Sequence, residues 1–246
     1  MNTVLNFAHR GASAYCPENT MAAFQRALEL GATGIETDVQ MTSDGHLVLI
    51  HDESLQRTAG SPKLVKDVTL EELKLLDAGS WFGPQFADER IPTLRELLEL
   101  VKPHEGVQIN IELKNGIALY PGLENAVIEE IRLQGLSERI IISSFNHYSL
   151  ALCKQLAPEV RTGVLYAEGL YEPWEYAARL GASALHAYHY AVLPEWAAQA
   201  AEQGIVYHPW TVNEPAEMMR LLKAGVAGII TDYPDRLGEL IKEYEA

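Results

Sequence analysis

The stretch GIETDVQ at residues 34–40 has the apolar frame of an interior β-strand, yet it carries Glu36 and Asp38 two positions apart. Side chains at positions i and i+2 of a strand point to the same face. Two carboxylates therefore share one side of a buried element, and burying like charges together is costly. The stretch predicts a compensating group beside these two acids.

Around this stretch, short apolar runs alternate with longer amphipathic segments, which is typical of βα units. The strand candidates are residues 4–9, 34–39, 107–114, 139–145, 160–166, 183–188, 205–212 and 226–232. The helix candidates are 18–31, 93–101, 122–135, 147–157, 171–181, 194–204, 214–225 and 234–244. Eight such pairs predict a (β/α)8 (TIM) barrel, with residues 1–246 as one domain. A doubly wound open sheet is the alternative, weakened because no G-x-G-x-x-G or P-loop pattern is found.

Charge and cysteine content narrow the function classes. The net charge of −15 argues against nucleic-acid binding, but it does not exclude an anionic small-molecule substrate, because a local field can oppose the global one. Two distant cysteines, Cys16 and Cys153, fit reduced thiols. No secretory signal and no apolar run of about 18 residues is present. We expect a cytoplasmic protein without stable membrane association, either a monomer or a homodimer.

Residues 40–92 separate the second strand from its helix and are too long for an ordinary βα loop. Their first part predicts a hairpin turning at Asp44-Gly45. With a two-residue turn, Asp38 faces His51 across the ladder, with both side chains on one face. A bulge would shift this register by one residue.

The remainder of this segment, residues 53–90, predicts a small insertion over one end of the barrel. It carries three aromatic residues, Trp81, Phe82 and Phe86.

Three carboxylates, those of Glu36, Asp38 and Glu112, are expected at neighbouring strand ends, where a barrel of this kind keeps its active site. Arg10 and Lys114 could neutralise them in a structural ring of ion pairs. Three acids against two bases favour a bound divalent cation instead. Ligation by carboxylate oxygens alone suits Mg²⁺ or Ca²⁺ rather than Zn²⁺.

His9 and His51 are expected beside this acid cluster. Because histidine titrates near neutrality, such a pair can supply one general base and one general acid. Arg10 offers a planar fork of donors suited to phosphate, and Lys114 offers a point charge. Together with a cation, these groups predict phosphoryl-transfer chemistry.

Other polar and aromatic residues have weaker assignments. Trp210 could belong to the core or could wall the apolar side of a small polyol, and the sequence leaves both open. The run HAYHY (186–190) has a His-x-x-His spacing, but it lies where alternate faces diverge, so we do not expect it to touch substrate. Both cysteines are expected only to pack.

The motifs of the chain resemble those of the glycerophosphodiester phosphodiesterases, of the bacterial cytosolic type. The most specific are HRG (9–11), PENT (17–20), IETDV (35–39) and HD (51–52). The likeness continues through SDG (43–45), L-x-RT (55–58), IPTL (91–94), IELK (111–114), SSF (143–145), WTVN (210–213) and ITDYPD (230–235). It therefore covers nearly the whole chain in order.

This resemblance implies a (β/α)8 barrel with an insertion after the second strand, and hydrolysis of glycerophosphodiesters to sn-glycerol 3-phosphate and an alcohol, a step of glycerol and lipid metabolism. It implies that the three acids ligate one Ca²⁺ or Mg²⁺ ion, that His9 and His51 form the acid–base pair, and that Arg10 and Lys114 bind phosphate. One histidine would deprotonate the glycerol 2-hydroxyl, which attacks phosphorus while the other protonates the departing alkoxide. Water would then open the cyclic phosphate.

Two alternatives remain beside this reading. A lysophospholipase D-type activity on lipid-like diesters would require an exposed apolar lip, for which the aromatic residues of the insertion are the candidates. A catalytically silent binding barrel would have lost His9, His51 or the acids, and the sequence retains them all.

Overall fold

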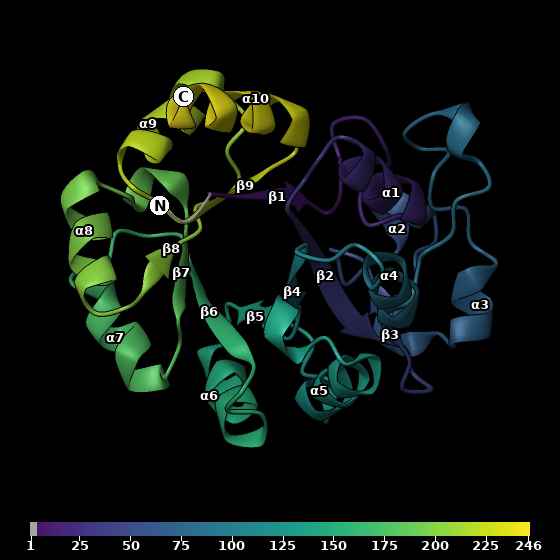
Figure 1. Ribbon diagram of the computed structural model, residues 1–246. Coiled ribbons are helices and arrows are strands. Elements are labelled where there is room, and N and C mark those ends of the chain that lie inside the picture. The colour runs from purple at the N-terminus through teal and green to yellow at the C-terminus, as the bar shows by residue number, and fades with distance from the viewer. Residues whose placement is uncertain (1–3) are drawn as a thin grey trace.

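The computed structural model describes residues 4–246, and over these residues eight parallel strands form a barrel (Figure 1). In spatial order they run β8-β7-β6-β5-β4-β2-β1-β9. Their bounds are β1 Leu5–His9, β2 Gly34–Met41, β4 Gln108–Leu113, β5 Ile140–Ser144, β6 Arg161–Tyr166, β7 Ala184–Ala187, β8 Val206–Tyr207 and β9 Gly228–Thr231. Backbone hydrogen bonds from Ala227 to Tyr207 (3.1 Å) and from Ile230 to Pro209 (2.9 Å) close the ring between β8 and β9. The predicted (β/α)8 fold is confirmed.

A ring of helices surrounds the strands (Figure 1). These helices are α1 Met21–Glu29, α4 Leu94–Val101, α5 Leu123–Gln134, α6 His147–Leu156, α7 Pro173–Leu180, α8 Pro194–Glu202, α9 Pro215–Lys223 and α10 Pro234–Glu245. Local sequence marks their starts: Thr93 and Glu96 form a capping box at α4, and the Thr20 hydroxyl accepts a hydrogen bond from the Ala23 amide at α1. The main apolar core lies between this ring and the barrel strands.

Strand β8 is much shorter than the predicted run 205–212, covering only Val206–Tyr207. Proline has no N–H to donate to a sheet ladder, and Pro209 follows closely. The chain nevertheless stays beside β7, because the amides of His208 and Trp210 donate to the carbonyls of Leu185 (2.9 Å) and Ala187 (3.1 Å).

The predicted hairpin forms between β2 and β3 (Leu47–Leu49), but its predicted register is wrong by one residue. Val39 pairs with Leu49, and the carbonyl of Asp38 accepts from the amide of Ile50 rather than from His51. The turn holds an extra residue because Gly45 adopts φ +85° and its amide bonds the Thr42 carbonyl. The chain leaves the ladder after Leu49, and this departure lets His51 reach the barrel mouth.

The segment after β3 builds a small structure outside α1 and α4 (Figure 1). It contains α2 Gln56–Ala59, α3 Leu70–Lys74 and 3-10 turns at Val65–Asp67 and Pro84–Phe86. With Val48 of β3 it forms a second apolar cluster, whose other members are Ile50, Leu55, Val65, Val68, Leu73, Ala78 and Ile91. The bounds 53–90 of the insertion stay a prediction. The extent of the single domain, 1–246, also stays a prediction, and residues 1–3 lie outside the part of the chain that the structure describes.

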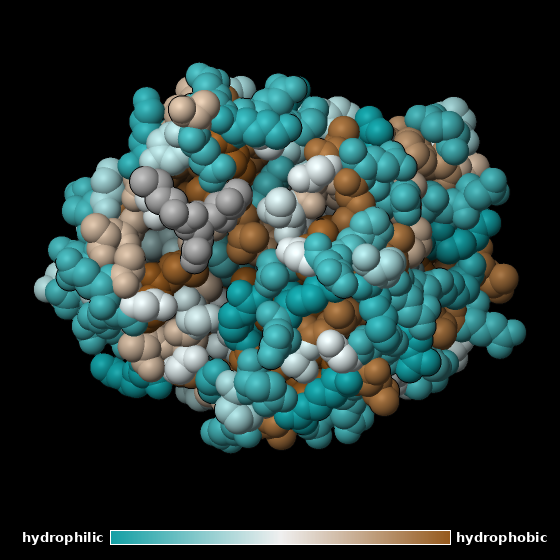
Figure 2. Space-filling model, in the orientation of Figure 1, coloured by the Kyte–Doolittle hydropathy of each residue, from teal (hydrophilic) through white to brown (hydrophobic). Residues whose placement is uncertain are grey.

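The face in Figure 2 is hydrophilic over most of its outer rim, with hydrophobic side chains in several separate patches. Within residues 4–246, the helices are all too short or too polar to cross a bilayer.

Candidate active site

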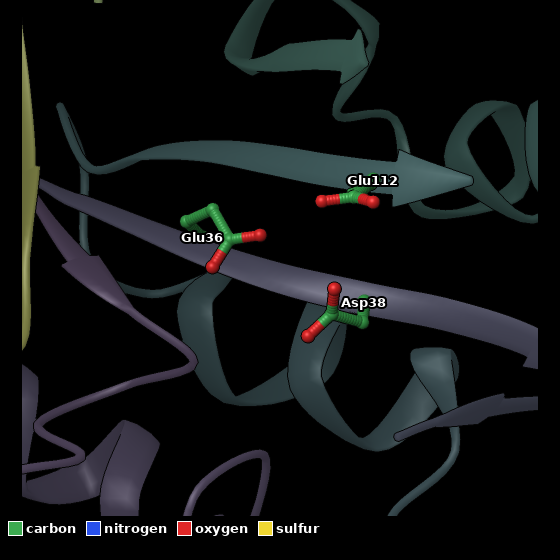
Figure 3. Close-up of side chains that lie close together, drawn as sticks. All are labelled: Glu36, Asp38 and Glu112. Atoms are coloured by element: carbon green, nitrogen blue, oxygen red, sulfur yellow. The ribbon is translucent and has the colours of Figure 1, made fainter. Parts of the chain in front are cut away.

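The three predicted acids lie together on two paired strands (Figure 3). In the parallel ladder between β2 and β4, Asp38 is the partner of Glu112, and Glu36 is the partner of Asn110. One carboxylate oxygen from each acid lies within 4.8 Å of the others. Glu36 and Asp38 are only 3% and 1% exposed, so the register concentrates negative charge in a buried place.

Two bases offset part of this charge. The Arg10 amide donates to Glu36 Oε2 at 3.0 Å, and Arg10 Nε lies 3.3 Å from Asp38 Oδ2. Lys114 Nζ donates to Glu112 Oε1 at 2.9 Å and lies 3.8 Å from Asp38 Oδ1. The bases therefore contact the acids directly, as the ion-pair alternative expects, but three carboxylates face two cations.

The excess of carboxylates over bases shifts the pKa values of the acids. Burial and the charges of Asp38 and Glu112 raise the pKa of Glu36 well above its usual range. Burial, then the charge of Asp38, raises the pKa of Glu112 to about 7. For Asp38, burial acts upward, but Arg10 and Lys114 hold its pKa below the usual value. The cluster is short of positive charge, and its oxygen-only donor set fits a hard divalent cation.

The HRG turn brings Arg10 to this cluster through an unusual backbone. Arg10 has φ +57° and Gly11 has φ +82°. A Cβ on Gly11 would lie 2.6 Å from the backbone carbon of Ala23, so only glycine fits there. The turn aims the Arg10 amide at Glu36, and this local strain is stored beside the acids.

The PENT motif orients Asp38. Asn19, at φ +55°, donates from Nδ2 to Asp38 Oδ2 at 2.9 Å, and its Oδ1 accepts from the Thr37 hydroxyl at 2.7 Å. Asn19 is buried and lies directly before the cap of α1. It therefore fixes the side chain of one acid from outside the barrel.

His9 is held by a carboxylate from the far end of the chain. Its Nδ1 lies 2.7 Å from Asp232 Oδ1, at the end of β9. Asp232 also accepts from the Ser13 hydroxyl at 2.9 Å and from Asn213 Nδ2 at 2.7 Å. With Nδ1 engaged, His9 Nε2 faces the acids, 4.0 Å from Glu36 Oε2.

His51 has a similar partner nearby. Its Nδ1 lies 2.7 Å from Asp52 Oδ1, and Asp52 accepts from Arg57 Nε at 2.7 Å. Arg57 also donates to Glu18, which in turn accepts from Arg10 Nη1 at 2.9 Å. Burial lowers the pKa of His51, against the opposing charge of Asp38. A continuous ionic network thus joins the insertion to the site.

These groups surround one cavity of about 80 Å³. It is lined by His9, Arg10, Glu36, His51, Asn110, Glu112, Lys114, Phe145, Leu165, Trp210, Thr211 and Ile230. Trp210 stands edge-to-face to Phe145 (ring centroids 5.7 Å apart), and its Nε1 donates to the His186 carbonyl at 2.7 Å. Of the two positions left open for Trp210, the structure therefore has it at the cavity; contact with substrate stays a prediction.

The two histidines of the run 186–190 and both cysteines lie outside the cavity. His186 is fully buried inside the barrel, where its Nε2 meets His208 Nδ1 at 3.2 Å, and His189 pairs with Glu217. Cys16 and Cys153 are buried free thiols.

Sequence reasoning missed several residues that support the site. The predicted strand 226–232 ends at Asp232, but the sequence predicts no role for this residue. It also predicts no role for Asp52, Glu18, Asn19 and Phe145. Each belongs to a motif quoted above, or to its immediate flank, so motif membership was the available signal.

Comparisons with known proteins all find the same family of phosphodiesterases. Residues 9–236 match the model of the glycerophosphoryl diester phosphodiesterase family. A glycerophosphodiester phosphodiesterase of Caldanaerobacter subterraneus is 52% identical over 239 residues, covering 97% of this chain and 98% of the relative.

Two solved structures are also similar. A phosphodiesterase of Oleispira antarctica, in complex with the product sn-glycerol-3-phosphate, has a TM-score of 0.89 at 31% identity, covering 98% of this chain and 97% of its own. A glycerophosphodiester phosphodiesterase of Agrobacterium tumefaciens has a TM-score of 0.84 at 28% identity, covering 96% of this chain and 99% of its own.

Proposed function

The chain belongs to the glycerophosphoryl diester phosphodiesterase family, and from that premise we propose that it releases sn-glycerol 3-phosphate and an alcohol from glycerophosphodiesters, using a divalent cation and two histidines. The observation that carries the proposal is the cavity lined by two of the clustered carboxylates, two bases and two imidazoles, with the third carboxylate, Asp38, within 4.8 Å of the other two. The sn-glycerol-3-phosphate complex of the Oleispira antarctica relative supports the identity of the product.

Glu36, Asp38 and Glu112 would hold one Ca²⁺ or Mg²⁺ ion, because they supply three converging hard oxygen donors. When bound, such an ion supplies positive charge against the charge that develops on the phosphoryl group. Arg10 and Lys114 line the same cavity. We assign both to the phosphate, where their donors orient its oxygens and hold phosphorus in place.

His9 and His51 move the protons in this proposal. Each has Nδ1 fixed by an aspartate at 2.7 Å, which leaves Nε2 for the reacting atoms. One Nε2 accepts the proton of the glycerol 2-hydroxyl as its oxygen attacks phosphorus. The other donates a proton to the alkoxide that leaves as the alcohol. Water then opens the cyclic phosphate, and the 2-oxygen takes a proton back.

The test is an assay of sn-glycerol 3-phosphate release from glycerophosphocholine by metal-stripped protein, with EDTA or with added Ca²⁺ or Mg²⁺. We expect no turnover in EDTA and recovery with one of the ions. His51→Ala should lower kcat by about 10²-fold or more. His46→Ala is the matched control, because this histidine lies on the same hairpin but is exposed. Turnover that resists EDTA would refute the cation, and a normal rate in His51→Ala would refute its role.

A lysophospholipase D-type activity is the second candidate, and one observation favours it. Trp81 packs edge-to-face on Phe82, and Phe82 on Phe86; Trp81 is 44% exposed, and its part in an apolar lip stays a prediction. The loop that follows β4 also exposes Ile117 (82%) and Leu119 (75%) at the barrel end that carries Glu112. If this loop receives an acyl chain, Ile117→Ser with Leu119→Ser should lower turnover of a monoacyl glycerophosphocholine and spare glycerophosphocholine. Equal effects on both substrates would exclude it.

A further inference from the structure

A second hollow adjoins the catalytic cavity. It holds about 530 Å³ and is more open than the first. The loop after β6 and the 3-10 turn His189–Ala191 after β7 form its walls, together with the start of α8. We call it the aromatic recess, lined by Ala167, Glu168, Gly169, Tyr188, Tyr190, Ala191, Trp196 and Trp210. Trp210 lines both hollows, so they meet at this indole.

Half of the residues that line the aromatic recess are aromatic. The ring of Tyr188 lies 5.4 Å from that of Trp210 at 70°, and 5.4 Å from that of Tyr190 at 72°. Rings set at such angles form a corner and present π faces in more than one direction. The corner is pre-formed: Trp210 is fixed through its indole N–H, and the amide of Tyr188 donates to the Tyr166 carbonyl at 3.0 Å.

Charge distinguishes the two hollows. The catalytic cavity has Arg10 and Lys114 in its wall beside Glu36 and Glu112, and the two bases offer cationic donors to a phosphate. Among the described residues that line the aromatic recess, the one charged side chain is the acid Glu168. Aromatic faces attract cations through the ring quadrupole, most strongly when the cation is weakly hydrated, and a nearby carboxylate adds to this attraction. The aromatic recess therefore suits a positive group.

The volumes of the two hollows also suit a phosphate in the catalytic cavity and a positive group in the aromatic recess. A cavity of about 80 Å³ has room for little more than the phosphoglycerol end of a diester, whereas the recess of about 530 Å³ can take a larger group. A diester whose phosphorus lies beside the two histidines must direct its alcohol outward. We propose that the aromatic recess binds the alcohol half of the substrate and selects alcohols that carry a quaternary ammonium group, such as choline. This inference rests on the proposed function.

The test compares kcat/KM for glycerophosphocholine with that for glycerophosphoinositol, whose alcohol is an uncharged polyol. In the wild-type protein we expect the choline diester to be favoured by about tenfold. Glu168→Gln and Tyr190→Leu should each lower this ratio by about threefold, through KM for the choline diester. Tetramethylammonium should inhibit competitively, and more weakly in both variants.

Matched controls lie further along the loop between β6 and α7, the loop that carries Glu168. Glu172→Gln and Tyr171→Leu make the same changes at exposed residues that do not line the recess, and they should keep the wild-type ratio. Equal kcat/KM for the two diesters, or a ratio unchanged in Glu168→Gln and Tyr190→Leu, would overturn the inference while leaving the proposed function intact. Failure to hydrolyse either diester would overturn the proposed function itself.

Discussion

Replacing Asp232 with asparagine should impair His9 without disturbing the three acids proposed to bind the cation. Asp232 Oδ1 lies 2.7 Å from His9 Nδ1, and Oδ2 accepts from Asn213 Nδ2 at 2.7 Å. In Asp232→Asn, the amide must keep its oxygen toward the Asn213 donor. Its NH₂ group then faces His9 Nδ1 and favours the tautomer that carries its proton on Nε2.

The Asp232→Asn substitution impairs His9 whether it acts as the general base or as the general acid. An imidazole already protonated at Nε2 cannot accept a proton there, so it fails as a base. As an acid it must become imidazolium, and the carboxylate that stabilises the imidazolium is gone. A hydrogen bond to a charged group contributes about 1.5–3 kcal/mol. Since about 1.4 kcal/mol corresponds to a factor of ten, kcat should fall by about 10- to 100-fold.

The assay is steady-state release of sn-glycerol 3-phosphate at saturating metal, from pH 5 to 9. KM should change little, because Asp232 does not line the cavity. The control is Asp235→Asn, which also replaces an aspartate by asparagine and removes one negative charge. Asp235 lies on α10, where its carboxylate accepts a hydrogen bond from the Tyr15 hydroxyl. A kcat for Asp232→Asn within threefold of the Asp235→Asn value, at equal thermal stability, would refute the reasoning.

Three further outcomes are expected. Adding Ca²⁺ or Mg²⁺ at about a hundred times its Kd should stabilise metal-stripped protein by about 2.7 kcal/mol and raise Tm by roughly 5–10 °C; the same shift in Glu112→Gln would contradict the acid site. Gly11→Ala should lower the unfolding free energy by about 2–4 kcal/mol in a denaturant titration, because of its positive φ and the contact with Ala23; a loss below 0.5 kcal/mol would refute this. Hydrogen bonds from Arg220 lower the pKa of Glu217 to about 2, so its contribution of about 1 kcal/mol is full above pH 4.5 and is lost as pH falls toward 2. Glu217→Gln should therefore be less stable than wild type at pH 7 but equal to it near pH 2, and a constant difference would contradict the assignment.

The acid cluster was accessible from sequence because it depends on backbone periodicity. Alternation along a strand puts Glu36 and Asp38 on one face, and parallel order in a barrel brings the next strand alongside with Glu112. Both rules hold whatever the side-chain rotamers are. The roles of these residues in binding metal stay predictions.

The remaining features depend on details that periodicity does not determine. One residue more in the turn at Gly45 shifted the hairpin register, and His51 reached the site by leaving the ladder. The contact of His9 with Asp232 spans 223 residues and depends on rotamers as well as on the pairing of β1 with β9. The aromatic recess arises from two separate loops, whose approach no local pattern predicts.

The pairing of His9 with Asp232 also bears on how the enzyme is made. A ribosome adds roughly 5–20 residues each second, so the 223 residues between the two partners take roughly 10–45 s to synthesise. Once synthesis has passed residue 112, the nascent chain contains all three acids and His51, but His9 still lacks Asp232 and β1 has no β9 beside it. Barrel closure and the arrival of the carboxylate that holds His9, a member of the proposed acid–base pair, are therefore the same late event of translation. A chain that ends before Asp232 should therefore have no hydrolytic activity.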